Sequence, residues 1–156
     1  MEAAELRRAY DDLLTEVAAG GFGPPPPGGL TVAQIVAHLA ANDELMIEVT
    51  EAVLAGSPWT YYDAQPTLPP QVDAMVAHPA GLSGLVAWLQ TTSGRVCALL
   101  DRLGPAAETP VDCHLREGTE VFVEESLPWG RMLDIHGRIH LPAHLRELRG
   151  LRPAAC

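Results

Sequence analysis

The chain contains no lysine. Its ten basic residues are all arginines, against a total of twenty aspartates and glutamates. The formal net charge at pH 7 is therefore −10. Binding of a phosphate backbone requires a basic surface, so this balance argues against DNA or RNA as a partner. The sequence also lacks any run that approaches about 18 apolar residues, the length that a membrane-spanning helix needs. We therefore expect no membrane span.

Cysteine is scarce and scattered. The three cysteines, Cys97, Cys113 and Cys156, form no C-x-x-C pair. An odd, dispersed set is more typical of a reducing cytoplasm than of a disulfide framework. The N-terminal stretch MEAAELRRAYDDLL is amphipathic and acidic, which excludes a signal or transit peptide. These observations predict a cytoplasmic protein.

The 156 residues, 47% of them hydrophobic, suit a single domain over 1–156 that is large enough to bury a core. Helical periodicity predicts long helices over about 2–19, 31–55 and 82–103, and a short one over 70–77. A last helix is expected to start near Pro128 with Ser126 as its cap. Period-two alternation around Gly118 predicts a β-hairpin before that helix. The expected fold is mostly α, a four-helix bundle with a small β-hairpin between helices 3 and 4.

Three histidines follow one another at spacings of four near the C-terminus: His136, His140 and His144, in LDIHGRIHLPAHLREL. Helical positions four apart share a face, with about 5–6 Å between Cβ atoms, so two such imidazoles can reach one metal ion. His38 lies on the apolar side of a second helix, in IVAHLAANDELM. Two ligands from one helix and one from a neighbour make a three-histidine site with an open coordination position. The alternative is an Arg- and His-rich surface face at a helix C-terminus, where cations favour the dipole.

Pro142 decides which histidines we select. A proline inside a helix cannot donate a hydrogen bond to the carbonyl four residues back, here that of Arg138, so we expect a kink or a restart at this point. His136 and His140 precede the disturbance, whereas His144 follows it. The predicted metal ligands are therefore His38, His136 and His140, with His144 as a reserve ligand or an outer group.

Each ligating imidazole needs an acceptor for its second nitrogen. Asn42, Asp43 and Asp134 are the nearest candidates in sequence, and each can equally be a solvated helix residue. Asn42 lies one turn from the histidine of its helix and could touch the pocket. The loop over 57–70 carries Trp59 and two tyrosines. It forms either the wall of a pocket or a hydrophobic lid over one end of the bundle.

The segments TVAQIVAHLAANDEL and MLDIHGRIHLPAHLREL resemble the DinB-like superfamily. That superfamily includes the N-terminal domains of mycothiol-dependent maleylpyruvate isomerases and related thiol-dependent S-transferases. The resemblance implies a four-helix bundle, often a homodimer, with a divalent metal, most often zinc or nickel, held by three histidines. Carried over to this chain, the ligands are His38, His136 and His140. The chain departs from the pattern at Pro142, which interrupts the last helix, and in its more developed hairpin.

The resemblance further implies a low-molecular-weight thiol, such as mycothiol or bacillithiol, as co-substrate. The expected function is then a metal-dependent S-transferase or thiol-dependent isomerase that acts on a small electrophile. Two alternatives stay open at this point. One is a non-catalytic protein that binds and sequesters a small molecule. The other is a metal-dependent hydrolase on the same fold, which would act without added thiol.

Overall fold

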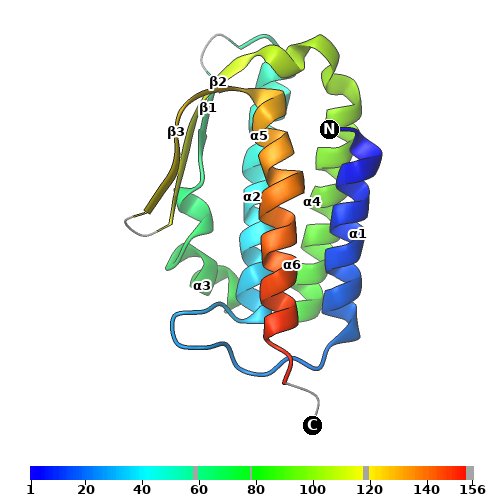
Figure 1. Cartoon of the computed structure of the whole chain (residues 1–156), viewed down its shortest axis with the longest axis vertical. Helices are drawn as coiled ribbons and strands as arrows, with labels where there is room; N and C mark the ends of the chain where they lie inside the picture. The colour runs from blue at the N-terminus through cyan, green and yellow to red at the C-terminus, as the bar shows by residue number, and fades with distance from the viewer. Residues whose placement is uncertain (58–59, 78, 118–119, 154–156) are drawn as a thin grey trace.

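The computed structural model describes residues 1–57, 60–77, 79–117 and 120–153. It is mostly helical, with one small three-stranded sheet (Figure 1). Helices α1 (Ala3–Ala19), α2 (Val32–Leu54) and α4 (Gly81–Leu103) lie alongside a fourth helical segment near the C-terminus. Their ends agree with the predicted ones to within one or two residues. No helix in the described part of the chain combines the length and the apolar character needed to cross a membrane.

Helix α2 begins at a capping box that the sequence TVAQ encodes. The Thr31 side chain accepts a hydrogen bond from the Gln34 backbone N–H, and the Gln34 side chain accepts one from the Thr31 N–H. Both otherwise unpaired donors at the helix start are thereby satisfied. The helix is buried over most of its circumference, and its interior positions include the polar residues His38, Asn42 and Asp43. These three polar side chains are thus carried into the core.

The fourth segment is one continuous rod made of α5 (Trp129–Ile135), the π-helical turn η3 (His136–His140) and α6 (Leu141–Gly150). The Leu141 N–H donates to the His136 carbonyl, five residues back. Pro142 has no N–H to offer one turn back, and the wider turn upstream accommodates it. The disturbance predicted at Pro142 is thus present as the π turn and the start of α6 at Leu141, but it separates His136 from His140, and α6 runs on through His144.

The predicted hairpin is present as β2 (Pro110–Glu117) and β3 (Glu120–Pro128), which pair antiparallel. Ser126 pairs with Asp112 inside this hairpin, so its predicted role as a helix cap is wrong; the helix begins after Pro128. A further strand that the sequence did not predict, β1 (Tyr61–Asp63), adds to β2 in parallel.

The remaining short elements connect these layers. The turns η1 (Gln65–Thr67) and η2 (Gly104–Glu108) are 3-10 helical, and α3 (Gln71–Val76) is the predicted short helix. Strand β1, η1 and α3 follow one another along the same side of α2 (Figure 1). This places the Tyr62 hydroxyl and the Thr67 carbonyl against α2, where both bond polar residues of that helix.

Candidate metal centre

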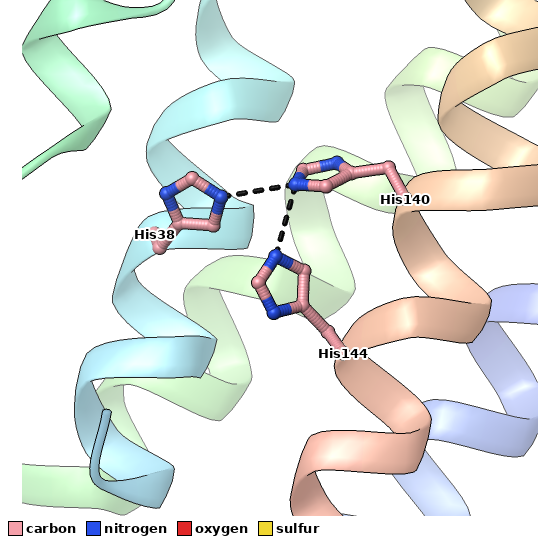
Figure 2. A group of neighbouring side chains, drawn as sticks. All are labelled: His38, His140 and His144. Atoms are coloured by element: carbon pink, nitrogen blue, oxygen red, sulfur yellow. Dashed lines mark hydrogen bonds between the residues drawn. The ribbon is translucent and has the colours of Figure 1, made fainter. Parts of the chain in front are cut away.

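Three histidine side chains point toward one another between two helical rods (Figure 2). His38 comes from α2, His140 from the end of η3 and His144 from α6. The Nε2 atom of His140 lies 3.0 Å from Nε2 of His38 and 2.9 Å from Nε2 of His144. One nitrogen from each ring lies within 4.8 Å of the other two. Two nitrogens bound to one zinc ion are at most about 4.2 Å apart, so the two closest separations fit a shared ion.

In two of these rings, the hydrogen-bond partner of Nδ1 shows which ring nitrogen carries the proton. Nδ1 of His38 donates to the Thr67 carbonyl oxygen at 2.7 Å, and Nδ1 of His144 donates to the Glu147 carboxylate at 2.6 Å. A neutral imidazole carries one N–H, so Nε2 of both rings presents a lone pair. Two lone pairs that face the same point repel each other unless a cation, or an N–H group such as that of His140 Nε2, lies between them. The donor set therefore fits a metal ion.

His140 has a partner of a different kind. Its Nδ1 lies 3.1 Å from Nδ1 of His136. With Nε2 as a ligand, Nδ1 of His140 carries the proton and donates it to His136. The same His136 nitrogen accepts from the Asn42 amide at 3.3 Å, and the Tyr62 hydroxyl donates to the other end of that amide. All three rings of the cluster thus have an acceptor behind them, as metal-bound histidines generally do.

The structure brings together two of the three predicted ligands, His38 and His140. The third predicted ligand, His136, lies outside the group whose nitrogens face one point, and His144 occupies that place instead. The reason is local geometry: His140 and His144 are four residues apart in regular α-helix, whereas the π turn changes the rotation between His136 and His140. Pro142, the reason for ranking His144 as a reserve ligand, is accommodated by the π turn between His136 and His140 and leaves the helix between His140 and His144 regular.

The other sequence-predicted residues lie further from the cluster. Asn42 is buried and contacts His136 rather than the three clustered rings. Trp59 lies outside the described residues. Asp134 forms an ion pair with the N-terminal ammonium of Met1 at 2.6 Å. His114 lies on β2, beside the Tyr61 ring, away from the helical histidines.

Burial lowers the pKa of three of these histidines, His38, His136 and His140. It lowers the pKa of His38 to about 4 and that of His136 to about 3. Burial, followed by the neighbouring His136, holds the pKa of His140 well below its usual value. A metal ligand must be unprotonated, so the nitrogens of His38 and His140 need not lose protons at neutral pH before they bind an ion.

A pocket of about 460 Å³ opens against two members of the cluster, His38 and His144. Leu68 and Val72 give it an apolar wall, and Glu147 lies at its edge. The loop over 57–70 thus contributes to a pocket wall through its second half. A small molecule bound there would lie beside the proposed metal position.

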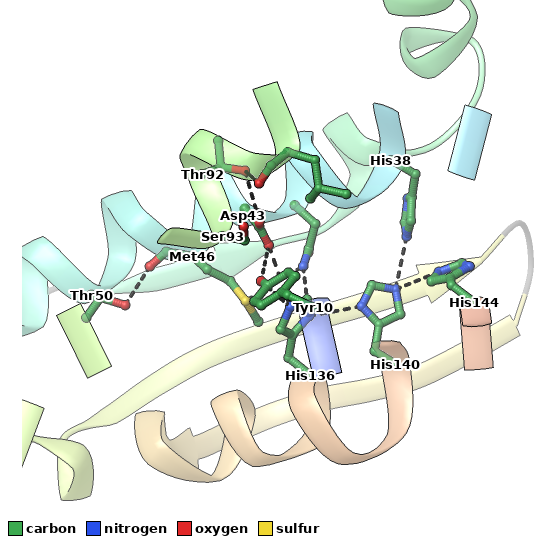
Figure 3. A network of polar contacts seen from close by, with 12 residues as sticks. Tyr10, His38, Asp43, Met46, Thr50, Thr92, Ser93, His136, His140 and His144 are labelled. Carbon is green, nitrogen blue, oxygen red and sulfur yellow. Dashed lines mark hydrogen bonds and ion pairs between the residues drawn. The ribbon is translucent and has the colours of Figure 1, made fainter. Parts of the chain in front are cut away.

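A second polar group continues from His136 into the core (Figure 3). Nε2 of His136 lies 2.8 Å from the Tyr10 hydroxyl, which donates to Oδ1 of Asp43 at 2.6 Å. The Thr92 hydroxyl lies 2.9 Å from Oδ2 of Asp43. Burial raises the pKa of Asp43 to about 8, against the opposing effect of the Tyr10 and Thr92 hydrogen bonds.

Sequence reasoning missed several of these partners. Glu147 follows His144 by three residues, a spacing that places both on one helix face and could have revealed the pair. Tyr10 lies on the buried face of α1, and a buried tyrosine hydroxyl generally requires a partner. The Thr67 carbonyl carries no side-chain signal at all, because its position depends on the fold of β1 and η1.

No protein-family model, curated protein or solved structure matches the chain. The site therefore rests on its own geometry.

We predict that His140→Ala and His144→Ala each abolish stoichiometric metal binding, since each removes one of three nitrogens that face the same point. His114→Ala serves as the matched control, because its ring lies on the sheet. Elemental analysis of protein purified without a histidine tag measures the outcome. Full metal content in His144→Ala would contradict this ligand assignment.

The buried Asp43 predicts a pH dependence of the metal-free protein. Its folded pKa of about 8 lies above the ordinary aspartate value of 3.8, so between these values the folded state holds a proton that the unfolded chain has released. The stabilisation by the neutral carboxyl is complete below about pH 4 and is lost as the pH rises through about 8. Asp43→Asn mimics the neutral form at every pH. The difference between the unfolding free energy of this variant and that of the wild type should therefore rise in favour of the variant from pH 5 to pH 8. Urea unfolding at several pH values tests this, and parallel profiles would contradict it.

Proposed function

We propose that the chain is a DinB-like four-helix bundle that holds one divalent metal ion through His38, His140 and His144. We propose further that it uses this centre to activate a low-molecular-weight thiol, which loses its proton and bonds through its sulfur to a small electrophile as the leaving group of the electrophile departs. The observation that carries the metal centre is the convergence of the Nε2 atoms of His38, His140 and His144 beside a pocket. The thiol chemistry is supported by the resemblance of the two histidine-bearing segments to thiol-dependent S-transferases.

The chemistry follows from the charge of the ligand set. A divalent ion held by three neutral imidazoles keeps its full +2 charge and lowers the pKa of a bound thiol or water. Zinc and nickel both suit such ligands. The protein's own contribution is to hold the three rings: the Thr67 carbonyl orients His38, the Glu147 carboxylate orients His144, and His136 orients His140.

The thiol in this proposal comes from outside the chain. Cys97 and Cys113 are buried, and burial raises the pKa of each to about 11. Among the cysteines that the structure describes, neither lines the pocket beside the histidines; Cys156 lies outside the described residues. A small thiol that enters this pocket, such as mycothiol or bacillithiol, is therefore the proposed nucleophile. The homodimer and the cytoplasmic location remain predictions.

We predict that the zinc- or nickel-loaded protein accelerates conjugation of mycothiol to a chromogenic chloroarene. The rate should fall to that of the metal-free protein in His140→Ala and stay unchanged in His114→Ala. Product formation is followed by absorbance, with and without thiol. Turnover of an ester substrate without thiol would indicate the hydrolase instead, and tight ligand binding with no turnover of either substrate would indicate the sequestering protein.

A further inference from the structure

Asp43 is an acidic residue in an unusual place. It is 0% exposed, on the inner face of α2. The described groups that bond its oxygens, the hydroxyls of Tyr10 and Thr92, are both neutral. A buried carboxylate is costly unless a positive charge or several hydrogen bonds compensate it. The nearest imidazole, that of His136, has its Nε2 3.6 Å from Oδ1 and bonds Tyr10 instead.

A continuous series of hydrogen bonds leads from this carboxyl group to the cluster of His38, His140 and His144 (Figure 3). The direction of each bond follows from its neighbours. Asn42 donates to Nδ1 of His136, so Nε2 of that ring carries the proton and donates to the Tyr10 oxygen. Tyr10 in turn donates to Asp43. At the other end, Nδ1 of His140 donates to His136.

The charges of the two outer partners complement the cluster. Three neutral imidazoles contribute no negative charge, so a bound divalent ion would leave +2 in a largely buried site. Glu147 places one carboxylate behind His144. For His140 the corresponding carboxyl group is that of Asp43, which is connected to it by hydrogen bonds through His136 and Tyr10. The third ring, His38, ends on the neutral Thr67 carbonyl.

We infer that Asp43, which is neutral in the metal-free protein, ionises when the divalent ion binds and becomes the buried counter-charge of the metal centre. It acts on His140 through the positioning residues Tyr10 and His136. This inference rests on the proposed metal centre. It assigns a role to His136, which lies outside the ligand group, and gives a reason for an acidic residue inside α2. Hydrogen bonding to a carboxylate raises the basicity of a ligating imidazole and holds its ring in place.

Two conservative variants test the inference. Asp43→Asn keeps the size of the side chain and an oxygen that can accept from Tyr10, but it cannot ionise when the metal binds. Tyr10→Phe keeps the ring and breaks the series at the hydroxyl. Zinc dissociation constants are measured by competition with a chromophoric chelator at pH 7.5, and the visible spectrum of the cobalt-loaded protein reports the ligand field. We expect each variant to weaken zinc binding about 10- to 100-fold, as removal of outer hydrogen-bond partners generally does.

The double variant distinguishes a connected series from two separate effects. If Asp43 acts through Tyr10, the double variant should bind zinc within about twofold of the weaker single variant. If the loss of zinc affinity in the double variant equals the product of the two single-variant losses, the idea that Asp43 acts through Tyr10 is overturned. Unchanged affinity in Tyr10→Phe would overturn it as well.

Glu44→Gln is the matched control, because it removes an acid from the next position on α2, where the side chain is exposed and bonds Trp88. Its zinc affinity should stay within about twofold of the wild type. Equal affinities of Asp43→Asn and Glu44→Gln would overturn the counter-charge. Thermal unfolding of the metal-free variants establishes that each is folded. Failure of the wild type to bind zinc at all would overturn the metal centre itself, which separates the two claims.

Discussion

The candidate site depends on the hydrogen bond made by the outer nitrogen of each histidine. An imidazole that donates through Nδ1 can only accept through Nε2, so the partner behind the ring decides what the ring offers in front. A carbonyl and a carboxylate behind His38 and His144 leave lone pairs at the shared point. The chemistry of the centre is in this sense set by Thr67, Glu147 and His136, none of which faces that point.

Polar side chains are tolerated in the core of this protein because they form hydrogen bonds with one another and with neighbouring elements. Asn42, Asp43 and His136 are all buried, and each has hydrogen-bond partners from other elements. Unpaired, each would cost the molecule free energy that an apolar side chain would not. Paired, they tie α2 to α1, α4, β1 and the C-terminal rod. The same hydrogen bonds thus fix both the packing of the helices and the orientation of the rings.

Local sequence signals predicted much of this arrangement. Hydrophobic periodicity located the helices, and alternation around Gly118 located the hairpin. Two members of the cluster, His38 and His140, followed from spacing and burial alone. The exchange of His136 for His144 did not, because it depends on a π turn, and the sequence showed only the proline that the turn accommodates. Strand β1 is three residues long and pairs with a strand some fifty positions away, so no local pattern predicts it.

The convergence of three Nε2 atoms on one cation is the claim from which the rest follows. A crystal of the zinc-loaded protein, measured on both sides of the zinc absorption edge, tests it directly. The account predicts a single anomalous peak between the rings of His38, His140 and His144. A peak bound by His136, or none within reach of these rings, would contradict it.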